Sequence, residues 1–276
     1  MELSEFAKKI LFGSTLEDKL IRPDKIEFDD DQKFREKVFN LPFKPARSEQ
    51  IGFSDENIKF PKGHFHLKEK QAIALHSFAN HELLACEMMA AALLRYPHDT
   101  EELKRFKRGI INTIFDEQKH FKLYVQQLER LGYSFGDYPL NDFFWSYMKD
   151  LDTPEKYTAV MAMTFESANL DFATYYEKIF RDLGEDEIAD VLLEVLKDEI
   201  SHVGFGVRYL NKWREDRELW NYYISQLPWP LTPARSKGQH FAYSPRLKAG
   251  MPREFIQSQK NYKDEFKVTK RKEWKQ

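Results

Sequence analysis

The chain contains a single cysteine, Cys86, among its 276 residues. One cysteine cannot form a disulfide within the chain, and structural zinc or iron–sulfur sites need several thiolates. A disulfide framework and a thiolate metal site are therefore both excluded within this chain. A reducing compartment fits such a composition.

Long apolar runs and a strong net charge are also missing. No segment approaches the roughly 18 uninterrupted apolar residues of a membrane span. Residues 1–6 include an early acid and lead to no apolar stretch with a cleavage site, unlike a secretory signal. The formal net charge is -2, so no overall basic field argues for nucleic acid. We therefore expect a cytoplasmic protein with no membrane partner.

Aromatic residues make up 15% of the chain, including 23 Phe, and can supply a sizeable core. The length suits one large domain or one domain with extensions. Residues 1–66 contain a short amphipathic pattern near 2–12 and then four interrupting prolines. We predict that residues 1–66 form an arm that wraps the main body rather than folding alone.

Four long stretches between residues 67 and 214 carry apolar residues at helical period. They form two successive hairpins, with helices predicted at 67–95, 101–131, 154–182 and 186–214. Pro154 stands at the first position of its helix, where proline is favoured. The fold class is therefore all-α, with a helical region at 67–214. Residues 215–276 form a Pro-rich extension with an amphipathic stretch near 252–266 and a basic tail, which is typical of a solvated end.

The sequence Asp-Glu-x-x-His occurs twice, at residues 116–120 and 198–202. Residues three apart project from one face of a helix, so each Glu and His can reach one metal ion together. A four-helix bundle that holds two metal ions needs this unit twice, plus one Glu from each of the other two helices. The duplication predicts the ligands Glu117, His120, Glu199 and His202.

The remaining ligands should come from the first helix of each hairpin. Glu166 lies among apolar neighbours, where a carboxylate is costly unless it is paired or bound to metal. On the earlier helix, both Glu82 and Glu87 are possible. Glu82 keeps phase with the apolar positions and is favoured, which would leave Glu87 as a charge on a solvated edge.

Four carboxylates balance two divalent cations, and oxygen and imidazole donors suit iron or manganese. Asp116 and Asp198 would form an outer layer that orients the histidines, or would be ordinary surface acids. Tyr124, Tyr175 and Tyr176 are interpreted as core residues in preference to a redox tyrosine. Gly204 and Gly206 are costly inside a helix, and a close helix approach beside the metal would explain them.

This residue set resembles the ferritin-like di-iron carboxylate superfamily. Strings at 81–87, 116–121, 165–171, 198–206 and 230–235 are similar to an uncharacterised bacterial ferritin-like family of unknown function. The resemblance implies a ferritin-like four-helix bundle with N- and C-terminal extensions. It also implies two iron ions, or a mixed iron/manganese pair, held by Glu82, Glu117, His120, Glu166, Glu199 and His202. A more distant similarity is to the di-iron tRNA-modifying hydroxylase.

These observations favour a non-haem di-iron oxygenase or oxidase that activates O₂ or peroxide to oxidise an organic substrate. The substrate would be a small molecule or a modified tRNA base, and an electron donor would be a partner. The long extensions favour a monomer or dimer over a storage cage. Two rival interpretations are a ferroxidase or metal-handling protein without organic substrate, and a structural bundle without turnover.

Overall fold

The computed structural model describes residues 1–30, 39–56 and 58–264. These residues are all-helical apart from loops and two isolated β-bridges, which confirms the all-α prediction. The predicted basic tail lies outside the described residues. Within them, no helix is long and apolar enough to cross a membrane.

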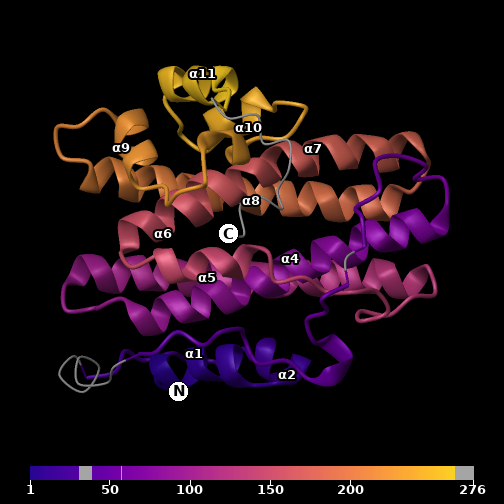
Figure 1. Cartoon of the computed structure of the whole chain (residues 1–276), viewed down its shortest axis with the longest axis horizontal. Coiled ribbons are helices and arrows are strands. Elements are labelled where there is room, and N and C mark those ends of the chain that lie inside the picture. Colours follow the sequence, from indigo (N-terminus) through magenta and orange to yellow (C-terminus); the bar gives the residue numbers. More distant parts are fainter. Residues whose placement is uncertain (31–38, 57, 265–276) are drawn as a thin grey trace. The chain divides into compact units, whose positions relative to one another are not determined.

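The described chain divides into two compact units, each considered by itself below. Unit 1 comprises residues 1–154 and 176–195, and unit 2 comprises residues 155–175 and the described residues from 196 on. The elements of the first part of the chain (Figure 1) are α1 (Leu3–Phe12), α2 (Leu16–Lys19), η1 (Glu49–Ile51), α4 (Lys68–Arg95), α5 (Glu101–Arg130) and η2 (Phe144–Asp150).

The second part begins with a continuous helical run, and two of its helices contribute residues to both units. The elements are α6 (Pro154–Val160), η3 (Met161–Glu166), α7 (Ser167–Asp182), α8 (Asp186–Trp213), α9 (Leu219–Ser225), η4 (Pro233–Ser236), α10 (Tyr243–Lys248) and α11 (Arg253–Asn261). The four long predicted helices therefore agree with the structure to within one or two residues.

In unit 1, α4 is the central helix and packs against both α1 and α5. Its buried residues lie on all sides, in contrast to the one-sided stripe of an amphipathic surface helix. Leu75 and Leu83 of α4 join Phe121 of α5 and Phe180 of α7 in one apolar cluster. Because α4 is enclosed from Gln71 on along most of its length, a charged residue buried within that stretch needs a partner.

Unit 2 has its own apolar core around the second half of α8. Val203 and Leu210 of α8 pack with Tyr223 of α9 and Phe255 of α11. The helical run that precedes α7 contains a π-helical segment, η3, which the period of the sequence did not predict. Such segments are short and are frequent at functional sites.

Gly206 of α8 allows η3 to approach closely. A Cβ at this position would lie 2.6 Å from Cβ of Ala162 and 3.1 Å from Sδ of Met163. Gly204 similarly faces the carbonyl oxygen of Ala249, at 3.2 Å from a Cβ placed there. A close approach is confirmed at both glycines, to η3 at Gly206 and to the residue after α10 at Gly204, and both neighbours belong to unit 2. That the approach lies beside a metal stays a prediction.

Candidate metal centre

Three predicted ligands meet within unit 1. Glu82 of α4 and Glu117 and His120 of α5 are buried, and each offers a ligand atom within 4.8 Å of the others. Nδ1 of His120 lies 3.3 Å from Oε2 of Glu117, one turn before it on the same helix. We call these three residues the first triad.

The other three predicted ligands meet within unit 2. Glu166 ends η3, Glu199 and His202 lie on α8, and their ligand atoms are also within 4.8 Å of one another. Nδ1 of His202 lies 3.3 Å from Oε2 of Glu199, the same separation as in the first triad. These residues form the second triad, and all six side chains are at most 5% exposed.

The separation of 3.3 Å suits two ligands of one ion better than a strong ion pair. Charge-assisted hydrogen bonds between a cationic nitrogen and a carboxylate are shorter, about 2.7–2.9 Å. Two donors each about 2.0–2.2 Å from an ion, at bond angles between octahedral and tetrahedral, lie roughly 3.0–3.5 Å apart. The buried carboxylate and imidazole groups of each triad can therefore hold a metal ion.

Glu87 does not lie on a solvated edge, contrary to the prediction. It is fully buried and receives two hydrogen bonds from Arg47, of 3.0 and 2.8 Å. The ammonium group of Lys19 lies 3.0 Å from Oε1 of Glu87, the oxygen that also accepts from Nε of Arg47. The prediction was wrong because α4 is enclosed on all sides, so no solvated edge exists at this position. Glu87 is occupied by cations, whereas Glu82 is placed with the first triad.

Lys19 and Arg47 tie the N-terminal residues to α4. Nζ of Lys19 also donates to the carbonyl oxygen of Ile10 at the end of α1, at 2.6 Å. Burial lowers the pKa of Lys19, and the carboxylate of Glu87 opposes that shift. Arg47 reaches a second residue of α4, Asn80, whose side chain bonds the carbonyl of Asn141.

Cys86 lies one turn after Glu82 and is completely buried. Burial, followed by the charges of Glu117, Glu82 and Glu87, raises the pKa of its thiol well above the ordinary value. The thiol therefore stays protonated at neutral pH and is a poor metal ligand. The first triad therefore offers oxygen and nitrogen atoms as its possible metal ligands.

The second triad has an amide beside it that sequence reasoning missed. Nδ2 of Asn169, on α7, donates to Oε1 of Glu199 at 3.1 Å. Hydrogen bonds of a side chain also stabilise the η3 segment. Oγ1 of Thr164 bonds the carbonyl oxygen of Ala159, in the preceding turn, and the hydroxyl of Tyr223 on α9. The one signal for Asn169 in the sequence is that it lies three residues after Glu166, a spacing that puts both side chains on one face of a helix.

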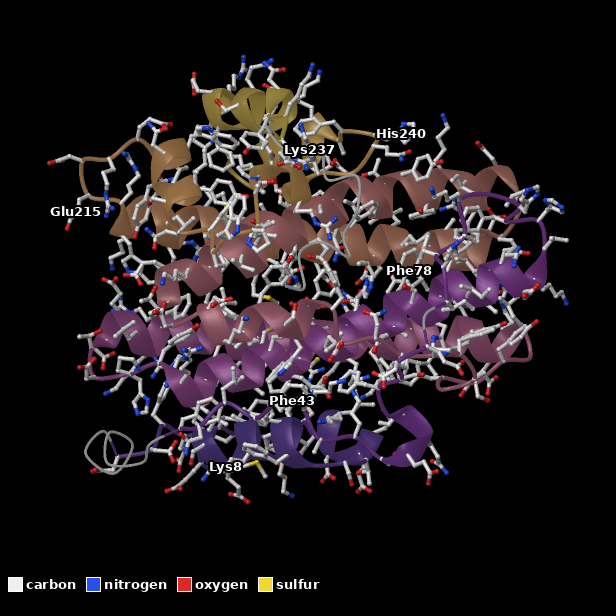
Figure 2. All side chains as sticks on the ribbon, viewed as in Figure 1. Lys8, Phe43, Phe78, Glu215, Lys237 and His240 are labelled. Carbon is white, nitrogen blue, oxygen red and sulfur yellow. The ribbon has the colours of Figure 1, made fainter. Side chains whose placement is uncertain are left out.

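The remaining residues singled out by the sequence have other surroundings. Asp116 and Asp198 are half-buried, and their role in orienting the histidines stays a prediction. Phe78 of α4 is labelled in Figure 2. Tyr124 and Tyr176 each pack against it with ring centroids 5.4 Å apart, in agreement with a core role. Tyr175 stacks on His240 at 4.4 Å. These tyrosines are therefore held in aromatic contacts.

A family model described as "Protein of unknown function (DUF455)" matches residues 6–257, a range that contains both triads. The chain belongs to this family. An "Uncharacterized protein" of Haemophilus influenzae is 26% identical over 165 residues, which cover 58% of this chain and 57% of that protein. The match thus spans little more than half of the relative's length. No solved structure matches the chain.

Proposed function

We propose that the two triads together bind two divalent metal ions in a ferritin-like four-helix bundle. The observation that carries this proposal is the repetition of one buried geometry, with Glu–His separations of 3.3 Å in both triads. Four buried carboxylates are costly unless their charge is compensated, and two divalent cations would compensate it. The ligands would be Glu82, Glu117, His120, Glu166, Glu199 and His202.

The donor set supports iron, or a mixed iron/manganese pair, as the native metal. Carboxylate and imidazole groups suit these ions, and the only thiol of the chain is kept protonated by burial. When bound, such a pair would supply redox chemistry toward O₂ or peroxide. The protein would then be a non-haem di-iron oxidoreductase acting on an organic substrate, for which a modified tRNA base is one candidate.

The chain's own residues would hold and shield this chemistry. Glu117 and Glu199 would each bind an ion together with the imidazole of their own motif, whose Nδ1 lies 3.3 Å from the carboxylate. Because the six side chains are at most 5% exposed, the surrounding residues would keep bulk water from the bound ions. An electron donor and a substrate would be the partners of a monomer or dimer in the cytoplasm.

A second candidate function is metal handling, as in a ferroxidase without organic substrate. The observation that favours it is the burial of all six side chains to 5% exposure or less. A closed site suits ions better than a large substrate, which needs a cleft.

Metal analysis with ligand variants tests the proposal. Apoprotein reconstituted anaerobically with Fe(II) should bind about two ions per chain. Glu117→Ala and Glu199→Ala should each lower that number, whereas Glu129→Ala, an exposed residue of α5, should leave it unchanged. A parent protein that never exceeds one tightly bound ion would contradict the paired site. Iron uptake far beyond two per chain, in a large spherical assembly by light scattering, would favour storage over the oxidoreductase.

A further inference from the structure

The second triad has a hydrogen bond that the repeated motif does not contain. Asn169 lies three residues after Glu166, and its side-chain NH₂ donates to Oε1 of Glu199 at 3.1 Å. An ionised carboxylate can only accept, so the donor side of the amide must face it. The residue three positions after Glu82 is Ala85, which has no such donor.

The hydrogen bond leaves one oxygen of Glu199 directed toward its triad. Oε1 is engaged by Asn169, while Oε2 lies 3.3 Å from Nδ1 of His202. The amide donor therefore fixes the orientation of the Glu199 carboxylate about its Cγ–Cδ bond. A carboxylate held in its binding orientation loses less freedom when it takes up an ion.

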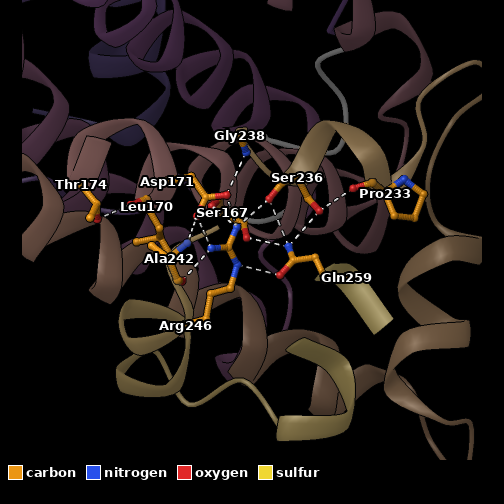
Figure 3. Close-up of polar contacts among 10 residues, drawn as sticks. All are labelled: Ser167, Leu170, Asp171, Thr174, Pro233, Ser236, Gly238, Ala242, Arg246 and Gln259. Atoms are coloured by element: carbon orange, nitrogen blue, oxygen red, sulfur yellow. Dashed lines mark hydrogen bonds and ion pairs between the residues drawn. The ribbon is translucent and has the colours of Figure 1, made fainter. Parts of the chain in front are cut away.

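The turn that carries Asn169 is itself held in place. The guanidinium group of Arg246, fully buried on α10, bonds the carbonyl of Ser167 and both carboxylate oxygens of Asp171 (Figure 3). Gln259 of α11 bonds both Arg246 and the hydroxyl of Ser167, at 2.8 Å each. The residues two before and two after Asn169 are thus attached to the C-terminal segment.

We propose that Asn169 is a positioning residue for Glu199, and that it makes the second triad the tighter of two inequivalent metal positions. This inference rests on the proposed function. It implies that the two positions fill in sequence, the second triad first. Outer hydrogen-bond partners of metal ligands typically change affinity by about 10–100-fold, so the two steps should be separable.

The test uses Co(II) titration of the full-length apoprotein in competition with a chelating dye, in two backgrounds. His120→Ala disables the first triad and leaves the second, and His202→Ala does the opposite. Asn169→Ala should weaken Co(II) binding about 10–100-fold in the His120→Ala background and by a clearly smaller factor in the His202→Ala background. Asn169→Asp keeps the size but replaces the donor by a repelling carboxylate, so its loss should be at least as large.

Asn211→Ala, an exposed amide of α8, is the matched control and should bind Co(II) like its parent. Thermal unfolding of each apoprotein shows whether a variant is folded, and a positioning role predicts little change there. Equal losses in both backgrounds, or no loss with either Asn169 variant, would overturn the inference while the proposed function stands. A parent protein that binds no Co(II) and no Fe(II) would overturn the proposed function and this inference together.

Discussion

The helical segments that carry Glu82 and Glu166 each contain a second acid that the metal motif does not explain. Five residues after Glu82 lies Glu87, and five residues after Glu166 lies Asp171. Both acids are at most 1% exposed, and each is bound by an arginine through two hydrogen bonds. The arginine comes from the N-terminal residues in unit 1 and from α10 in unit 2.

We call these two arginine-bound acids, Glu87 and Asp171, the anchors. They differ in their further partners. Glu87 also meets Lys19, so two cations share one carboxylate. Asp171 meets one cation, Arg246, and accepts from the backbone N–H groups of Gly238 and Ala242. On both helices, the role of a buried acid is decided by whether a cation from a distant segment reaches it. Candidate ligand and anchor are both carboxylates of one helical segment, so the chemical group alone does not separate them.

The strongest test of this comparison replaces Glu82 and Glu87 of α4 by alanine, one at a time. Glu87→Ala leaves Lys19 and Arg47 buried without their carboxylate and should lower the free energy of unfolding by about 3–5 kcal/mol. Glu82→Ala should instead lose about one metal ion, with a smaller change in apoprotein stability. Urea unfolding and metal analysis measure the two effects. Loss of an ion from a stable Glu87→Ala protein would reverse the assignment.

The anchor of unit 2 should respond in the same way. Arg246→Met leaves the buried carboxylate of Asp171 without its cation and should cost about 3 kcal/mol or more of unfolding free energy. Adding Asp171→Asn removes that charge and should restore part of the loss. Arg253→Met, at an exposed position of α11, serves as the control in the same chemical denaturation experiment. An additive double variant would show that the two side chains are not coupled.

Acidification should affect unit 1 through His76. Nε2 of this buried residue accepts a hydrogen bond from the backbone N–H of Gly136 at 3.0 Å, so the neutral imidazole is required. Burial lowers the pKa of His76 to about 4, against the opposing charge of Asp137. Its stabilising effect is therefore complete above the unfolded pKa near 6.5 and is lost as the pH falls through the folded pKa.

The loss through His76 should reach at most about 3 kcal/mol by pH 4, at about 1.4 kcal/mol per unit of pKa shift. His76→Gln keeps an acceptor for Gly136 but cannot titrate. We therefore expect its apoprotein to lose less stability than the parent between pH 7 and pH 4.5 in urea unfolding. Parallel pH profiles for the two proteins would contradict this role of His76.

The smallest expected effect is a difference in stability between alanine variants of the two glycines of α8. Alanine is favoured over glycine in a helix by about 1 kcal/mol, so a substitution without a clash should stabilise. Gly206→Ala places a methyl group 2.6 Å from Cβ of Ala162 and should cost about 1–3 kcal/mol by overpacking against η3. Gly204→Ala meets only the carbonyl of Ala249 at 3.2 Å and should be nearly neutral. Thermal unfolding that ranks the two in reverse order would contradict the close approach of η3.

Much of the fold could be predicted because helix formation depends on local spacing. The four long helices followed from apolar residues at helical period and from Pro154, and their ends agree with the structure closely. The π-helical turn of η3 was not predicted, since it depends on Thr164, Tyr223 and Gly206, which are far apart in the sequence. The burial of Glu87 was missed for a related reason, because Lys19 and Arg47 lie 68 and 40 residues before it.

The sequence by itself determined the two Glu–His pairs, because residues three apart on a helix meet in any fold that keeps the helix. It also determined the absence of a thiolate site, since the chain has one cysteine. Only the tertiary structure decided which acid of α4 joins the first triad, which acids become anchors, and that Asn169 supports Glu199. These outcomes depend on cations and amides brought from distant segments, and a carboxylate's role follows from the partner that compensates its buried charge.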